Sequence, residues 1–149
     1  MIIDTGIDRD HPAFGPDNNS DGIADRIVFN YDFSGSNDSD ASDTNGHGTN
    51  VASIVGSSNG TYTGMAPGVN IIALKVFPDN INNATDADIE EALQWCVANA
   101  AAYNIAAVNL SLGGSTNFNH YEDNDSRSDE MAALVSLEQA VVKLRMLAI

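Results

Sequence analysis

Strand-like and helix-like apolar patterns alternate along this chain, and no other feature limits its possible folds as strongly. The apolar run VNIIALKVF, residues 69–77, lies between Gly68 and Pro78 and is typical of a strand buried on both faces. Apolar residues at helical spacing follow, and they predict a helix from the N-cap residue Thr85 to about Tyr103. A strand, a helix and a further strand in this order indicate parallel strands joined by crossover helices.

The remaining segments continue the same order. Residues 1–4 predict the end of a buried strand, 27–33 a short strand and 105–110 a further strand. Residues 46–57 predict a helix, and 134–148 predict another amphipathic helix. We therefore expect an α/β fold with one open, doubly wound, mostly parallel sheet and helices on both faces. Residues 1–149 fit a single domain, which we expect to be incomplete at both ends because the pattern starts within a strand and stops as a helix ends.

Charge and cysteine content exclude several classes of partner. Six basic and 21 acidic residues give a net charge of −15, which argues against binding to nucleic acid or to an anionic membrane. The single cysteine, Cys96, excludes an internal disulfide and a cysteine-based zinc site. No run approaches the roughly 18 apolar residues of a membrane span, and no signal peptide precedes the first strand. No pattern specifies an oligomeric state.

The first strand ends in Asp4-Thr5-Gly6, a triplet that occurs in two unrelated kinds of peptidase. An aspartic peptidase needs a small residue after the triplet, a second copy or an obligate dimer, and an all-β chain. Here Ile7 follows, there is no second copy, and helices are predicted in the middle of the chain. The aspartic peptidase interpretation is therefore disfavoured, and a triad aspartate is the alternative.

The segment NGHGTNVAS, residues 45–53, carries the second candidate residue, His47. Glycines flank this histidine at the start of a predicted helix, which leaves the ring free to face a cleft. An imidazole titrates near neutrality and can act as a general base. A carboxylate on one ring nitrogen fixes the tautomer for the other, so Asp4 and His47 form a candidate catalytic pair.

These segments resemble the subtilases, the subtilisin-like serine peptidases. IIDTGIDRDHPAF (2–14) is similar to the family's aspartate block, and NGHGTNVASIVG (45–56) to its histidine block, although Asn50 replaces the usual second histidine. GMAPGVNIIALKVF (64–77) and VNLSLGG (108–114) are similar to strands beside the peptide-binding cleft. The resemblance implies that Asp4 and His47 belong to a triad, and that the chain acts on a polypeptide substrate in an extracellular location. It also implies that the cleft is bordered by substrate-binding residues Ser111, Leu112 and Gly113.

The family's triad serine and oxyanion asparagine have no counterpart in these residues. The sequence Gly56-Ser57-Ser58-Asn59-Gly60 matches the G-x-S-x-G pattern of hydrolases, but a helix rather than a strand precedes it, so we interpret the match as chance. Ser111 ends a strand and is interpreted as a cleft residue. We therefore expect part of a serine endopeptidase domain that is inactive alone. The alternative is a non-catalytic calcium-binding or peptide-binding module.

The loop DNNSDGIAD, residues 17–25, has the alternating oxygen ligands of a calcium-binding loop. Its spacing, D-x-N-x-D-G-x-x-D, matches the first nine positions of an EF-hand loop, but Val28 stands where the twelfth-position acid belongs. The pattern predicts a structural calcium ion. Its expected ligands are Asp17, Asn19, Asp21, the carbonyl of Ile23, and Asp25.

Overall fold

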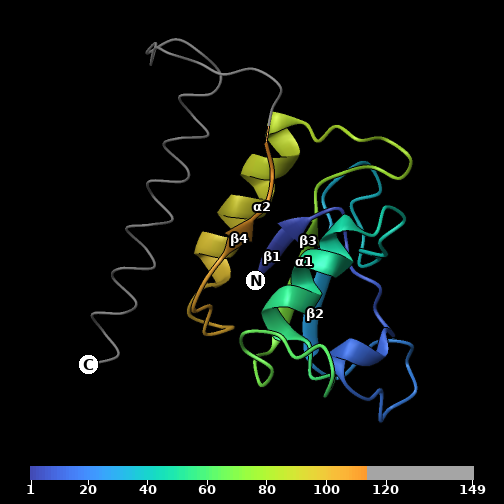
Figure 1. Ribbon diagram of the computed structural model, residues 1–149. Helices are drawn as coiled ribbons and strands as arrows, with labels where there is room; N and C mark the ends of the chain where they lie inside the picture. The colour runs from blue at the N-terminus through green and yellow to red at the C-terminus, as the bar shows by residue number, and fades with distance from the viewer. Residues whose placement is uncertain (114–149) are drawn as a thin grey trace.

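Four parallel strands form the sheet of the computed structural model, which describes residues 1–113 (Figure 1). They are β1 (Ile2–Asp4), β2 (Ile27–Asp32), β3 (Ile71–Lys75) and β4 (Asn109–Leu110), in the order β2-β3-β1-β4. This arrangement confirms the predicted parallel α/β sheet. The predicted helix over 134–148 lies outside the described residues. Because β1 lies between β3 and β4, Asp4 ends an internal strand of the sheet.

The helices α1 (His47–Gly56) and α2 (Asp86–Asn99) pack on opposite faces of this sheet (Figure 1), and a short 3₁₀ helix, η1 (Pro12–Phe14), lies near α1. Alternate residues of each strand face one helix or the other. The core on the α2 face includes Ile3, Ile72, Leu74, Leu93 and Cys96. The core on the α1 face includes Ile2, Ile7, Ile71, Ala73 and Ala52.

Side-chain hydrogen bonds explain where the helices begin and end. The Thr85 hydroxyl accepts a hydrogen bond from the Asp88 amide at 3.2 Å, as the sequence predicts for an N-cap. At the C-terminal end of α1, the Arg26 guanidinium donates to the carbonyl of Gly56 at 2.7 Å. Helix α2 ends at Asn99, earlier than the predicted Tyr103, and turns lead to Asn104, whose left-handed φ of 50° stops the helical winding.

Strand β4 is shorter than the strand predicted over 105–110. It pairs with β1 through the register Ile2↔Asn109 and Ile3↔Leu110. Before this ladder, the Met1 amino group donates to the carbonyl of Ala107 at 2.9 Å, and the Asn109 amide donates to the carbonyl of Met1 at 2.9 Å.

Lys75 is a basic residue inside the apolar run that forms β3. Its side chain is buried on the α1 face, where Nζ donates to the carbonyl of Ser42 at 2.8 Å and pairs with Asp79. The Thr44 hydroxyl donates to the same Asp79 carboxylate at 3.0 Å. These bonds satisfy the buried ammonium group and attach the loop before α1 to the loop after β3.

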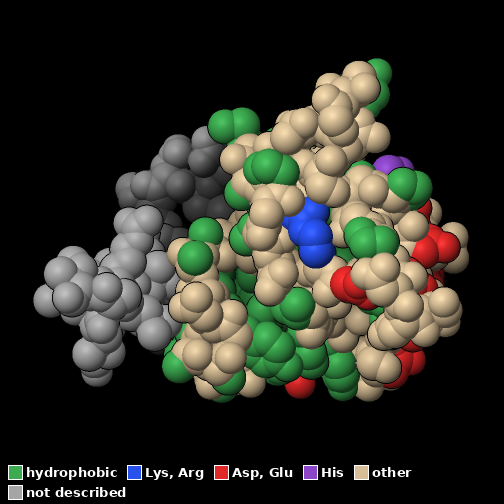
Figure 2. Space-filling model, turned by 90° about the horizontal axis from the view of Figure 1, so that it is seen from below, with side chains coloured by type: hydrophobic (Ala, Val, Ile, Leu, Met, Phe, Trp, Pro, Cys, Tyr) green, Lys and Arg blue, Asp and Glu red, His purple; other side chains and the backbone are tan. Residues whose placement is uncertain are grey.

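The surface carries the excess of acidic residues. On the face in Figure 2, acidic side chains gather along one side, and basic side chains form a small patch near the middle. Within residues 1–113, no helix is long and apolar enough to cross a membrane.

Candidate active site

Asp4 occupies the carboxyl end of β1, where its side chain is only 1% exposed. Its Oδ1 atom accepts a hydrogen bond from the Thr5 amide at 2.7 Å. Its Oδ2 atom is buried and has no hydrogen-bond partner among residues 1–113. A carboxylate held in this way has a fixed orientation and a free lone-pair direction toward a neighbouring donor.

His47 is the first residue of α1, and its ring meets the Asp4 carboxylate. The Nδ1 atom lies 2.7 Å from Asp4 Oδ1, while the His47 side chain remains 51% exposed. An ionised carboxylate only accepts hydrogen bonds, so Nδ1 carries the proton and Nε2 is left as the acceptor. The structure thus brings together the two residues that the sequence predicts as a pair. The arrangement can take a proton from a hydroxyl group placed at Nε2.

Glycines allow the strand end and the helix start to approach each other. A Cβ atom on Gly48 would lie 2.2 Å from the carbonyl oxygen of Gly6, and one on Gly6 would lie 2.6 Å from the carbonyl oxygen of Ala41. Gly46, the N-cap residue, has a φ of 91° that other residues rarely adopt. The glycines around His47 therefore serve the geometry of the helix start as well as access to the ring.

Two residues that the sequence analysis did not single out, Thr5 and Asp43, are hydrogen-bonded around this pair. The Thr5 hydroxyl donates to Asp43 Oδ1 at 2.9 Å and accepts from the Gly48 amide at 2.9 Å. The signal that could have identified Asp43 is its position, four residues before His47, because an acidic residue before a helix is a common N-terminal cap.

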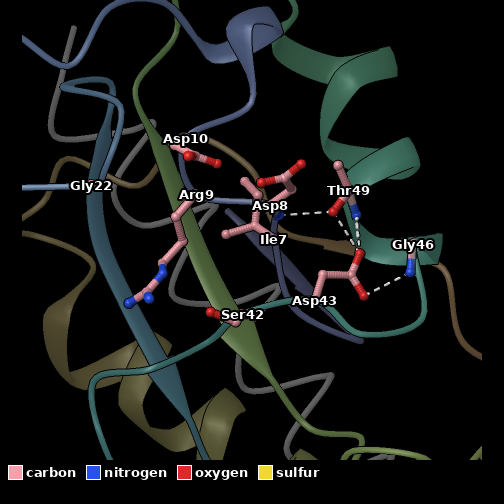
Figure 3. A pocket seen from close by; sticks show the side chains of 9 residues that line it. All are labelled: Ile7, Asp8, Arg9, Asp10, Gly22, Ser42, Asp43, Gly46 and Thr49. Atoms are coloured by element: carbon pink, nitrogen blue, oxygen red, sulfur yellow. Dashed lines mark hydrogen bonds between the residues drawn. The ribbon is translucent and has the colours of Figure 1, made fainter.

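A pocket of about 380 Å³ lies beside these residues (Figure 3). Neither Asp4 nor His47 is among its lining residues, which are Ile7, Asp8, Arg9, Asp10, Gly22, Ser42, Asp43, Gly46 and Thr49. Burial raises the pKa of Asp8, and a hydrogen bond and the negative charge of Asp10 raise it further. The pocket is thus an acidic recess next to the candidate pair and not the location of the pair itself.

The predicted substrate-binding residues follow strand β4. Ser111 and Gly113 are exposed, and Leu112 is partly buried. The Ser111 hydroxyl donates to Asn109 Oδ1 at 2.9 Å. Because β4 pairs in parallel with β1, these residues leave the sheet at the same edge as Asp4.

The predicted calcium ligands lie in an exposed loop that folds around Gly22. Asp17 Oδ2 accepts from the Gly22 amide at 2.8 Å, and Asp21 Oδ1 accepts from the Ile23 amide at 2.9 Å. Asn19 Oδ1 accepts from the Asp21 amide at 3.2 Å, so Asp17, Asn19 and Asp21 gather around one turn.

The Asp25 carboxylate accepts hydrogen bonds from the amide and the side chain of Asn18, in the same loop. In the part of the chain that the structure describes, no group of three or more His, Cys, Asp or Glu side chains is arranged to hold a metal ion. The oxygen atoms of Asp17, Asn19 and Asp21 fit a calcium ion by their chemistry.

Comparison with known proteins finds proteases among the relatives of this chain. Alkaline serine exoprotease A from Vibrio alginolyticus is 39% identical over 113 residues, which make up 76% of this chain and 18% of that protein. Subtilisin-like protease 3 from Trichophyton equinum is 41% identical over 118 residues, or 76% of this chain and 25% of that protein. The chain therefore corresponds to a minor part of the length of these relatives.

The fold comparison gives the same kind of protein. The crystal structure of a cold adapted subtilisin-like serine proteinase matches with a TM-score of 0.69 and 31% sequence identity, over 93% of this chain and 41% of that one. The model of the Subtilase family, peptidase S8, matches residues 1–146. Since this match extends over nearly the whole sequence and agrees with the parallel sheet flanked by helices, the chain belongs to the subtilase family.

Proposed function

We propose that this chain supplies the aspartate and the histidine of a subtilisin-like serine endopeptidase. The observation that carries the proposal is the 2.7 Å contact between Asp4 Oδ1 and His47 Nδ1. Asp4 holds the imidazole in one tautomer and stabilises the imidazolium. His47 Nε2 removes the proton of a serine hydroxyl as that oxygen attacks the peptide carbonyl, and then gives it to the leaving amine.

The attacking serine is proposed to come from polypeptide outside these 149 residues. Ser58 follows helix α1, and its hydroxyl donates to the carbonyl of Ala13 at 3.2 Å. The Ser111 hydroxyl is bonded to Asn109. In subtilisin itself, loss of the serine lowers turnover by a factor of order 10⁶. We therefore expect the 149-residue polypeptide alone to have no inhibitor-sensitive peptidase activity.

A chimera tests the proposal. Residues 1–149 would replace the matching part of the Vibrio alginolyticus exoprotease, whose remaining part would supply the rest of the enzyme. We expect the chimera to hydrolyse a chromogenic peptide. Asp4→Asn should lower its turnover by roughly 10⁴-fold and His47→Ala by roughly 10⁶-fold, whereas Asp10→Asn is the matched control. Turnover by the isolated chain that a serine-directed inhibitor blocks, or an active His47→Ala chimera, would refute the proposal.

We further propose that Ser111, Leu112 and Gly113 border the peptide-binding cleft and pair with an extended substrate by strand addition. Support comes from their exposure and from the position of β4 beside β1. In the chimera, Gly113→Pro removes a backbone amide and should raise KM, while Gly113→Ala keeps the amide and meets no atom within 4 Å. Equal KM values for the two variants would argue against strand addition at this position.

We also propose that a calcium ion stabilises the loop at residues 17–25, through Asp17, Asn19, Asp21, Ile23 and Asp25. Calcium should raise the melting temperature of the chain, and Asp17→Ala or Asp21→Ala should remove this rise. Asp38→Ala, outside the loop, is the control for lost charge, and magnesium at equal ionic strength is the control for screening. An unchanged melting temperature in calcium would refute the site. Calcium or peptide binding, together with an inactive chimera, would instead favour a non-catalytic binding module.

We also propose that the protein is extracellular. Membership of the subtilase family supports this proposal. A protein that works outside the cell should function at millimolar calcium, the range in which extracellular calcium modules bind, so the chimera should be active in such a medium.

A further inference from the structure

Asp43 joins the start of helix α1 to the loop before it (Figure 3). Its Oδ2 atom accepts from the Thr49 amide at 2.9 Å and from the Thr49 hydroxyl at 2.6 Å. Its Oδ1 atom accepts from the amides of Gly46 at 2.9 Å and Asn45 at 3.1 Å. Because the N-cap residue is a glycine without a side chain, Asp43 does the capping that this helix end requires.

Thr5 extends this network to the strand that carries Asp4. Its hydroxyl donates to Asp43 Oδ1 and accepts from the Gly48 amide, while its own amide donates to Asp4 Oδ1. Thr5 is buried, with 8% of its surface exposed. One residue therefore contacts the Asp4 carboxylate, the helix start and the Asp43 carboxylate.

The Thr49 hydroxyl carries the same network to the loop after β1. It donates to Asp43 Oδ2 and accepts from the Asp8 amide at 2.9 Å (Figure 3). The strand end and the loop that follows it are thus both tied to α1 through Asp43. Two hydroxyl groups and three amides, from four residues, would lose an acceptor if this carboxylate were removed.

We propose that Asp43 and the Thr5 hydroxyl are positioning residues that hold His47 against Asp4. No hydrogen bond between residues 1–113 joins either group to the imidazole ring, so they act through the strand end and the helix start. This inference rests on the proposed function, in which Asp4 and His47 form the acid–base pair. It adds two residues that set the geometry of that pair without contacting the reacting atoms.

The charge of Asp43 strengthens this role. Burial opposes ionisation, but hydrogen bonds from Thr49, Gly46 and Thr5 outweigh it and lower the pKa of Asp43. An ionised acceptor makes stronger hydrogen bonds than a neutral one. Thr5 donates to Oδ1 of Asp43 and Thr49 donates to Oδ2. An asparagine at this position would replace one of these oxygens by an NH₂ group, which cannot accept, so it cannot satisfy both Thr5 and Thr49.

The proposal can be tested on the 149-residue chain by proton NMR of the His47 ring, without any need for turnover. A proton held between Nδ1 and a carboxylate gives a downfield signal, and Asp4→Asn should remove it and so assign it. We expect Thr5→Val and Asp43→Asn to broaden or abolish the signal. Thr5→Ser keeps the hydroxyl and should retain it, as should Asp40→Asn, which removes a carboxylate from the same loop.

Far-UV circular dichroism would establish that each variant is folded. A folded Thr5→Val or Asp43→Asn variant with the signal of the parent would overturn the inference and leave the proposed function intact. Loss of the signal in Thr5→Ser as well as Thr5→Val would also overturn it, because the hydroxyl would not be the group responsible. A parent chain with no His47 signal at all would count against the Asp4–His47 pair, and hence against both proposals.

Discussion

At the scale of single residues, the contact between strand β1 and helix α1 depends on the absence of side chains. Gly48 faces the backbone of Gly6 so closely that an added Cβ would lie 2.2 Å from its carbonyl oxygen. The same Cβ would lie 3.1 Å from the Cβ of Asp4. Neither neighbour is a flexible side-chain end, so the backbones would have to separate. Gly48 therefore sets the distance at which His47 can reach Asp4.

Gly48→Ala should destabilise the chain by about 1–3 kcal/mol, the usual cost of overpacking a close contact. Gly60→Ala is the matched control, because a Cβ on Gly60 meets nothing within 4 Å. Urea denaturation of both variants measures the free energy of unfolding. Equal midpoints would show that the backbone at Gly48 yields without cost.

A second prediction at this scale concerns acid stability. Because its pKa is lowered in the folded chain, Asp43 stabilises the fold above its ordinary pKa of 3.8, and this contribution is lost as the pH falls through the lower folded value. Asp43→Asn should therefore reduce the loss of stability on acidification, whereas Glu91→Gln, on the exposed side of α2, should not. The measurement is the urea midpoint across an acidic pH series. An Asp43→Asn variant with the full acid dependence of the parent would contradict this prediction.

At the scale of elements, helix α2 covers one face of the sheet with apolar residues. Ala92, Leu93 and Cys96 are buried against the strands. Trp95 stacks on Phe29 of β2, with ring centroids 4.4 Å apart. Such packing keeps α2 docked on the sheet, because undocking would expose its apolar side to water.

The docking of α2 predicts an unreactive thiol. Burial raises the pKa of Cys96 to about 11, so the thiolate needed for alkylation is scarce at neutral pH. Iodoacetamide should modify Cys96 slowly in the folded chain and rapidly in denaturant, as mass spectrometry would measure. Destabilising variants such as Gly48→Ala should react faster than the parent. Equal rates for folded and unfolded chains would mean that α2 does not remain packed on the sheet.

At the scale of the whole molecule, the net charge of −15 opposes the compact state. The acidic side chains gather on part of the surface in Figure 2, which brings like charges near one another. Repulsion between exposed charges is screened by salt over about 10 Å at 0.1 M.

Sodium chloride should accordingly raise the melting temperature as the ionic strength increases from low to physiological values. Thermal unfolding followed by circular dichroism measures this change. A neutral osmolyte at matched osmolality separates screening from exclusion effects. We expect salt to raise and not lower the melting temperature because the chain has 21 acidic residues and only six basic ones. A melting temperature that falls as salt is added would mean that ion pairs such as Arg9–Asp40 outweigh the repulsion.

The sequence by itself determined the fold class and predicted the two central residues of the candidate site. Periodicity is a local property, so the apolar runs were enough to predict β3, both described helices and a parallel sheet. Asp4 at a strand end and His47 between glycines were also visible in short segments. Local patterns did not give the two-residue length of β4, because a strand ladder depends on pairing with a neighbour that is distant in the sequence.

Only the tertiary structure decided which side chains meet around the ends of the strands. The hydrogen bond from Thr5 to Asp43 joins residues 38 positions apart, and the one from Lys75 to the carbonyl of Ser42 joins residues 33 apart. Neither contact leaves a periodic or compositional trace in the sequence. Each arises because parallel strands end at one edge of the sheet and bring their loops together there. A local pattern can place a residue on an element, but the order of strands decides what that residue touches.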